Sequence, residues 1–319
     1  MRVFILGGSG LIGMAVVQNL IAAGHDVFAL ARSDQSLAKL AAIGAHPIRG
    51  DIRDPAPWCD TLPTVDGVIH LACDFANDMA AIDARFLGEL IPALHRISDQ
   101  TGHTPRFIYT GGSWLFPANR LDHGFGNETT PLDPLPDFAW MVFGLSKILF
   151  DAKLHGMVIH PGTVYRTNPG TQITEPPSDL PGGVLYEMVR SARDENRIEI
   201  VGDGTVLWPM VHTDDLADLY RRVFEHGKRG QSYIGVGVKG IRTAVLARLI
   251  AARFGNSDCD ISHISPDQAA QKYGQWAHGL GHSHRLSSQK AMAKLGWHPR
   301  HTDIARDLDI HLTGMQCTP

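Results

Sequence analysis

Residues 2–13 read RVFILGGSGLIG, a short apolar run rich in β-forming residues, then glycines, then apolar residues at helical spacing. The glycines fit two overlapping templates, Gly8-x-Gly10-x-x-Gly13 and Gly7-x-x-Gly10-x-x-Gly13. In either template one glycine makes a tight turn, one lets the backbone approach a pyrophosphate, and one allows close packing of helix on strand. Free N–H groups and the helix dipole favour an anion at the helix N-terminus. The stretch therefore predicts a dinucleotide-binding turn formed by Gly7, Ser9, Gly10, Leu11, Ile12 and Gly13.

Apolar strands alternate with helices through the first half of the chain. We expect strands at 2–6, 26–30, 46–51, 66–73, 106–112 and 156–165, with long helices at 76–97 and 137–154. This alternation predicts an α/β fold with a doubly wound parallel sheet, covered by helices on both faces. We expect a cofactor domain at 1–165, joined by returning elements from 200–238, and a smaller C-terminal substrate-binding lobe made of 166–199 and 239–319.

The composition excludes several classes of partner. The 319 residues carry a net charge of −4 and no run of Lys or Arg, so we expect no nucleic acid partner. No apolar run reaches the ~18 residues that a membrane span needs, so we expect no membrane partner. The four cysteines have no paired spacing, as is typical of unpaired thiols in a reducing cytoplasm. A small-molecule substrate is the remaining expectation.

The end of the second strand indicates which dinucleotide binds. An acidic side chain there would accept hydrogen bonds from the ribose 2′-hydroxyl of NAD. The chain has Arg32 and Ser33 instead, a cation and a hydroxyl that suit the 2′-phosphate of NADP. We therefore expect NADP, with NAD the less favoured alternative because Asp34 is adjacent.

Eight motifs occur in the order and approximate spacing of a known superfamily: GGSGLIG (7–13), GDIRDP (50–55), HLA (70–72), YTGGSWLF (109–116), FGLSK (143–147), HPGTVY (160–165), VHTDDLADL (211–219) and LGWHP (295–299). In these motifs the chain resembles the extended short-chain dehydrogenase/reductases, which include nucleotide-sugar epimerases, dehydratases and many ketone or aldehyde reductases. The resemblance implies a Rossmann cofactor domain. It places Asp51 and Ile52 at the adenine and assigns the rest of the cofactor cleft to Leu71, Ala72, Cys73, His160, Pro161, Thr163 and Val164.

The resemblance also exposes a departure at the catalytic position. The superfamily carries Tyr-x-x-x-Lys, in which the lysine binds the nicotinamide ribose and lowers the pKa of the tyrosine, so that the phenol exchanges a proton with substrate. Lys147 matches the lysine, but Phe143 stands at the tyrosine position and has no exchangeable proton. The accompanying Ser/Thr position falls on Gly112, or on Ser113 after a slip of one residue, with Thr110 nearby.

Three hypotheses follow from this departure. The first is an NADP-dependent oxidoreductase acting on a small, fairly apolar carbonyl or alcohol, with Lys147 as a catalytic residue. Its proton would come from Ser113 or Tyr165, with His123 and Cys73 as further candidates. The second is a nucleotide-sugar epimerase or dehydratase. The third is a non-catalytic NADP-binding regulator.

Other constellations carry weaker expectations. His278, His282 and His284 are spaced by glycines that argue against a helical zinc site, so we expect no metal. Core packing is the default role of the tryptophans at positions 114, 140, 208 and 276, although they could line an apolar substrate pocket. The helices at 76–97 and 137–154 are apolar enough to form the four-helix homodimer interface that extended members of the superfamily often use.

Overall fold

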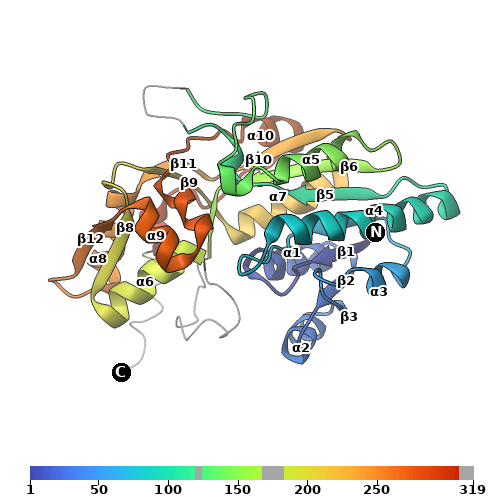
Figure 1. Ribbon diagram of the computed structural model, residues 1–319, viewed down its shortest axis with the longest axis horizontal. Coiled ribbons are helices and arrows are strands. Elements are labelled where there is room, and N and C mark those ends of the chain that lie inside the picture. Colours follow the sequence, from blue (N-terminus) through green and yellow to red (C-terminus); the bar gives the residue numbers. More distant parts are fainter. Residues whose placement is uncertain (119–123, 167–182, 309–319) are drawn as a thin grey trace.

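A computed structural model describes residues 1–118, 124–166 and 183–308 of the chain. A seven-stranded parallel sheet lies at the centre of the fold, with strand order β10-β6-β5-β4-β1-β2-β3 (Figure 1). The predicted doubly wound α/β sheet is thereby confirmed. The strands are β1 (Arg2–Leu6), β2 (Asp26–Ala31), β3 (His46–Arg49), β4 (Gly67–His70), β5 (Arg106–Thr110), β6 (His155–Pro161) and β10 (Gln231–Gly235).

Alternation along the strands gives the sheet two apolar faces. On β1, Val3 and Ile5 face one core, while Phe4 and Leu6 face the other. The first core is covered by α1 (Leu11–Ala22), α7 (Thr213–His226) and α10 (Gln289–Leu295), and Leu40 of α2 (Asp34–Ala42) joins it. The second core is covered by α3 (Ala56–Asp60), α4 (Met79–Thr101) and α5 (Met141–Phe150).

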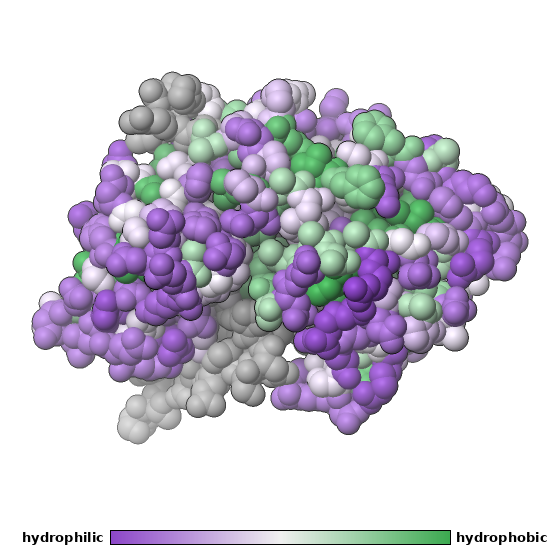
Figure 2. Space-filling view, viewed as in Figure 1, coloured by the Kyte–Doolittle hydropathy of each residue, from purple (hydrophilic) through white to green (hydrophobic). Residues whose placement is uncertain are grey.

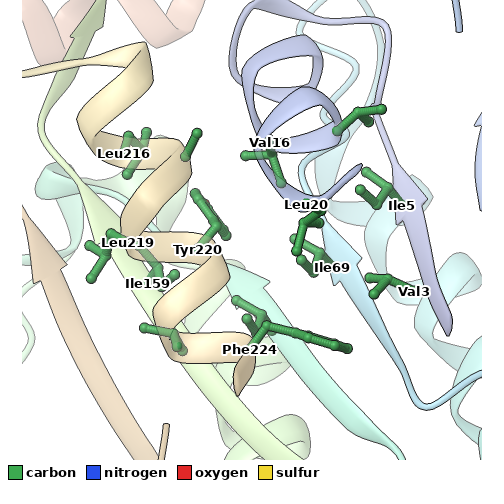
Figure 3. Close-up of a cluster of buried hydrophobic side chains, with 14 of the residues drawn as sticks. Val3, Ile5, Val16, Leu20, Ile69, Ile159, Leu216, Leu219, Tyr220 and Phe224 are labelled. Carbon is green, nitrogen blue, oxygen red and sulfur yellow. The ribbon is translucent and has the colours of Figure 1, made fainter. Parts of the chain in front are cut away.

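The first core joins α1 to α7 above the sheet (Figure 3). Val16 and Leu20 of α1 lie opposite Tyr220 and Phe224 of α7, and all four side chains are fully buried. Each such side chain contributes about 1.5–3 kcal/mol through burial alone. The α1 helix, and with it the glycine turn that precedes it, is thus held firmly against the sheet.

The prediction of one strand over 156–165 is wrong, because the chain changes sheets at Gly162. A Cβ at Gly162 would lie 2.6 Å from the carbonyl oxygen of Pro209, so only glycine lets the two backbones approach this closely. Beyond this point β7 (Thr163–Tyr165) pairs with β9 (Leu207–His212), which also pairs with β11 (Val238–Arg242).

A smaller lobe surrounds a separate two-stranded parallel sheet, β8 (Arg197–Val201) with β12 (Asp260–Ile264). Its apolar cluster draws on α6 (Gly183–Glu195), α8 (Thr243–Phe254), α9 (Pro266–Tyr273) and the 3-10 segment η3 (Gln275–Gly281). By contrast, α10 and Trp297, within the range predicted as lobe, pack into the first core of the main sheet. Residues 167–182, within the range predicted as the substrate-binding lobe, lie outside the described residues.

The helix predicted at 137–154 is shorter in the structure. A 3-10 turn, η2 (Pro136–Phe138), precedes α5, and another, η1 (Ser113–Leu115), follows β5. The α5 helix ends at Phe150 because Asp151 adopts an extended conformation (φ −65°, ψ 126°) and its carboxylate accepts hydrogen bonds from the Lys153 N–H and from His95. Within the described ranges, no helix has the length and apolarity that crossing a bilayer requires.

Candidate functional site

The glycine turn between β1 and α1 is built as its spacing predicts. Gly7 has a positive φ of 81°, and a Cβ there would lie 2.8 Å from the backbone nitrogen of Ala72. A Cβ on Gly13 would lie 2.0 Å from the carbonyl oxygen of Gly7. Both positions therefore exclude any larger residue, and the turn is pressed against the end of β4 at Leu71 and Ala72.

The N-terminus of α1 has no side-chain cap. Gly10 precedes the helix and has no side chain to cap it, while its own N–H donates to the Gly7 carbonyl oxygen at 3.0 Å. The first-turn N–H groups of Leu11 and Ile12 are consequently available to an anion. Ser9 is half-buried in the same turn. Gly183, at the start of α6, lies against both Leu11 and Val164, which brings β7 beside this turn.

The ends of β2 and β3 form the side of the site where the resemblance places the adenosine. The Ser33 hydroxyl caps α2 by accepting from the Ser36 N–H at 3.1 Å. The Asp34 carboxylate accepts a hydrogen bond from the Arg49 guanidinium, a group that also donates to the Arg32 carbonyl oxygen. The Arg32 side chain is exposed. The Arg32 cation is thus presented beside a carboxylate that is already paired with Arg49.

Asp51 and Ile52 follow β3 and are half-buried. Partial burial alone would raise the pKa of Asp51, but hydrogen bonds from the Arg53 side chain and backbone lower it overall. Trp58 donates from Nε1 to the Asp51 carbonyl oxygen at 2.9 Å and fixes the turn. The carboxylate therefore stays ionised beside the exposed arginine side chains of this edge.

The strand ends nearer the centre of the sheet carry the remaining predicted cofactor residues. Leu71 and Ala72 are half-buried. Cys73 is exposed as a residue, but burial of its sulfur raises the pKa of the thiol to about 12. His160 and Pro161 at the end of β6 are buried, whereas Thr163 is half-buried. The His160 ring lies against Gly111, where a Cβ would approach its Nδ1 to 2.5 Å. Burial lowers the pKa of His160 to about 4, so the ring is neutral at physiological pH.

Phe143 and Lys147 occupy one exposed face of α5. The Lys147 Nζ lies 4.4 Å from the centroid of the Phe143 ring, and 62% of Phe143 is exposed. The opposite face of the helix is buried at Gly144, where a Cβ would lie 3.0 Å from the Tyr109 hydroxyl. The pair predicted from the superfamily motif is therefore assembled, with its aromatic ring open to solvent.

The hydroxyl candidates for proton transfer differ sharply in what surrounds them. Tyr165 is buried and donates to Asp307 Oδ2 at 2.6 Å, and burial together with this carboxylate raises its pKa well above the usual value. This environment does not support Tyr165 as the proton donor. The Thr110 hydroxyl donates to the His70 carbonyl oxygen at 2.5 Å and lies 2.7 Å from the Tyr220 hydroxyl.

The other candidate positions for the catalytic hydroxyl, Gly112 and Ser113, lie directly after β5. Ser113 is buried at the start of η1. A Cβ on Gly112 would have no neighbour within 4 Å, so this position faces open space. His123 lies outside the described residues.

Sequence reasoning missed a buried polar cluster behind α5. The Tyr109 hydroxyl donates to Asp83 Oδ1 at 3.0 Å, and His70 Nε2 lies 3.5 Å from the same oxygen. All three side chains are buried. The available signal was Asp83 itself, an acidic residue on the face of α4 that otherwise carries Ile82 and Phe86.

The C-terminal histidines and tryptophans have separate environments. His278 lies 3.3 Å from both Asp137 and Asp267, so carboxylates that the sequence did not place nearby are present. His284 is buried and hydrogen-bonded to the Phe116 carbonyl oxygen. Trp208 is buried and donates to the Leu280 carbonyl oxygen, which makes it a core residue. No three potential ligand side chains in the described ranges are grouped to hold a metal ion.

Comparison with known proteins places this site in a family. Residues 3–236 match the NAD dependent epimerase/dehydratase family. An uncharacterized protein of Saccharomyces cerevisiae is 29% identical over 97% of this chain and 98% of its own length. The 2-alkyl-3-oxoalkanoate reductase of Stenotrophomonas maltophilia is 26% identical over 70% of this chain and 66% of its own length.

Among solved structures, the UDP-glucose 4-epimerase of Thermus thermophilus in complex with NAD superposes on this chain with a TM-score of 0.77. The superposition covers all of both chains, which are 18% identical in sequence. That likeness supports the fold, and the family match covers the dinucleotide turn and every strand of the main sheet. The chain accordingly belongs to the NAD dependent epimerase/dehydratase family.

Proposed function

We propose that the protein is an NADP-dependent oxidoreductase that interconverts a small carbonyl compound and its alcohol. The observation that carries the proposal is the uncapped helix N-terminus after Gly10, set against the strand ends that hold the remaining cofactor positions. When bound, NADPH supplies a hydride to the carbonyl carbon. The carbonyl oxygen takes up a proton, so that the products are the alcohol and NADP⁺.

Preference for NADP rests on the environment of Arg32. Its neighbour Asp34, which could have received an NAD ribose, is held by Arg49, and Ser33 is committed to capping α2. The exposed Arg32 side chain is then the group best placed to meet a 2′-phosphate, through charge-assisted hydrogen bonds. Ser33 contributes through the helix N-terminus that it caps rather than through a free hydroxyl.

On the substrate side, Lys147 would hold the nicotinamide ribose and Phe143 would leave the usual donor position without a hydroxyl. Because most of Phe143 is exposed, water reaches that position before substrate binds. The proposed reaction therefore takes its proton from solvent or from Ser113, the candidate hydroxyl beside the open position at Gly112. The missing hydroxyl at position 143 also favours the alternative of a non-catalytic NADP-binding regulator.

Calorimetry with NADPH and NADH tests the cofactor assignment. We expect NADPH to bind more tightly than NADH to the wild-type chain. Arg32→Ala should weaken NADPH binding about tenfold to a hundredfold and leave NADH binding nearly unchanged, because a charge-assisted hydrogen bond contributes about 1.5–3 kcal/mol. Equal affinities for both cofactors in the wild type would refute the NADP assignment.

Turnover then separates the functional alternatives. NADPH oxidation with a panel of ketones and aldehydes is the expected result for a reductase. Conversion of a nucleotide diphosphate sugar without net NADPH consumption would instead identify an epimerase or dehydratase. Tight NADPH binding with neither activity, also after Phe143→Tyr, would identify a regulator.

A further inference from the structure

Four aromatic side chains from separate segments meet beside the ends of β4 and β5. Phe75 follows β4, Trp114 lies in η1 after β5, Phe138 lies in η2, and Trp276 lies in η3 of the smaller lobe. The Trp114 and Trp276 rings stack with centroids 6.3 Å apart, Trp114 and Phe138 lie 4.9 Å apart, and Phe75 meets Trp276 edge-on at 6.0 Å. We refer to these four residues as the aromatic wall.

The inner half of the aromatic wall is fixed and its outer half is open. Phe138 is buried, and Trp114 packs so closely on Gly279 that a Cβ there would lie 2.4 Å from the indole. In contrast, 51% of Phe75 is exposed and Trp276 is only half-buried. Rigid aromatic rings with a free surface provide apolar contact area at little conformational cost.

The position of the wall ties it to the site already described. In open parallel sheets ligands bind outside the carboxyl ends of the strands, and β4 and β5 are adjacent there. Phe75 comes three residues after Ala72, which contacts the dinucleotide turn, and Trp114 comes two residues after Gly112. The wall therefore borders the space in which a substrate would meet the cofactor.

The charges around the wall select the kind of ligand. The four segments that carry it (73–79, 112–116, 136–141 and 274–281) contain Asp74, Asp78 and Asp137 but no Lys or Arg. The imidazole of His278 is already flanked by Asp137 and Asp267. A diphosphate placed here would meet carboxylates with no guanidinium or ammonium from these segments to pair it.

We propose that the aromatic wall binds the apolar body of an uncharged aryl ketone or aldehyde, and that Phe75 and Trp276 determine this specificity. The inference rests on the proposed oxidoreductase function and names the substrate class of that same site. The acidic residues that border the wall make the diphosphate of a nucleotide sugar a poor fit there.

The test measures binding of three probes to the full chain saturated with NADP⁺: acetophenone, hydroxyacetone and UDP-glucose. We expect acetophenone to bind at least about tenfold more tightly than the other two. Trp276→Ala and Phe75→Leu should each weaken acetophenone binding about threefold to tenfold, which is the scale of a lost aromatic contact, without changing the affinity for hydroxyacetone. Phe75→Leu keeps an apolar side chain at an exposed position, so folding is preserved.

Met292→Ala is the matched control, because Met292 is an exposed apolar residue on α10, remote from these segments in the chain. It should leave the affinity for all three probes unchanged. Equal affinities for acetophenone and hydroxyacetone, tighter binding of UDP-glucose, or insensitivity to both wall variants would overturn the inference. Each of these outcomes leaves the proposed function standing so long as NADPH binds, whereas absence of NADPH binding would end the proposed function itself.

Discussion

Restoring a hydroxyl at position 143 is the most direct perturbation of this site. Phe143→Tyr adds one oxygen to a ring that is 62% exposed, so the change meets no packing obstacle. Gly112→Ser adds the second missing hydroxyl at a position with no neighbour within 4 Å of the new Cβ and an extended φ of −172°. Neither substitution should cost measurable stability, which leaves turnover as a clean measurement.

The expected magnitude follows from the position of Lys147. Its Nζ lies 4.4 Å from the ring centroid of residue 143. Taking ~5 Å between the ammonium and a phenolate oxygen, their attraction is about 0.8 kcal/mol in a water-like medium and about 3 kcal/mol at an effective dielectric of 20. The pKa of the new phenol would fall from ~10 to between ~8 and ~9.4, since one pKa unit corresponds to about 1.4 kcal/mol.

Because Lys147 is exposed, solvent screens its charge, and the pKa of the new phenol stays near ~9.4 until substrate covers the phenol and Lys147. General acid catalysis contributes about 10²- to 10⁴-fold, so we expect Phe143→Tyr to raise kcat about 10²-fold at pH 7.5. Adding Gly112→Ser should increase kcat further. The affinity for NADPH should not change, since neither side chain contributes to the dinucleotide turn.

The assay is NADPH oxidation with acetophenone under saturating cofactor. Phe125→Tyr is the matched control, because Phe125 is also an exposed aromatic residue beside a cation, with the Lys239 Nζ 5.2 Å from its ring centroid, and it lies outside α5. The control should leave kcat unchanged. If Phe143→Tyr alters kcat less than twofold while the wild type turns over, the proton enters elsewhere and the assignment of position 143 is refuted.

Three further predictions concern the turn, the buried histidines and the helix pair. Gly13→Ala should lower the free energy of unfolding in urea by about 1–3 kcal/mol, because its Cβ would collide with the Gly7 carbonyl oxygen. The control is Gly88→Ala in a helix, where a Cβ has no neighbour within 4 Å, and it should raise the free energy of unfolding by up to about 1 kcal/mol. Burial lowers the pKa of three histidines to about 4, so the unfolded chain binds protons below pH ~6.5 that the folded chain does not bind. The free energy of unfolding should therefore fall as the pH drops from ~6.5 toward ~4, by up to about 1.4 kcal/mol per pH unit for each of these histidines. Urea midpoints at pH 7.5 and 5.5 check this, and a flat profile would contradict it; the histidines are His160, His212 and His284. Apolar side chains gather over α4 and α5 on an otherwise mostly hydrophilic face (Figure 2). Light scattering should therefore show a homodimer at micromolar concentration, and Phe150→Asp should convert it to a monomer. A monomeric wild type would contradict this prediction.

Local patterns in the sequence were sufficient for the main sheet. The glycine spacing after β1 and the alternation of apolar strands with helices depend on short stretches of chain, and both were predicted correctly. The break at Gly162 was not predictable in this way, because it depends on the Pro209 backbone, which is 47 positions later in the chain and approaches to within 2.6 Å of the Cβ position. Apolar residues on both sides of that glycine read as one strand although they pair in two sheets.

Within the site, the contacts between neighbouring residues were predictable from the sequence, and the contacts between distant segments were not. Lys147 and Phe143 are four positions apart, so a helical pattern alone placed them together. The Tyr165 hydroxyl was an equally plausible donor from sequence, but its partner Asp307 is 142 residues away and gives it a buried, fully used hydrogen bond. The aromatic wall joins four segments, and no pairwise spacing predicts that Phe75 meets Trp276.

The departures around the strand ends form one consistent environment rather than separate losses. His160 fills the space beside Gly111, so no side chain fits there, while the next residue, Gly112, faces open space. Phe143 on α5 also lacks a hydroxyl and is mostly exposed. With neither hydroxyl present and water free to enter, the proton for a carbonyl oxygen bound there would come from solvent or from Ser113. Turnover of the wild type should then lack the steep pH dependence that a titrating phenol would impose, and Phe143→Tyr should introduce it.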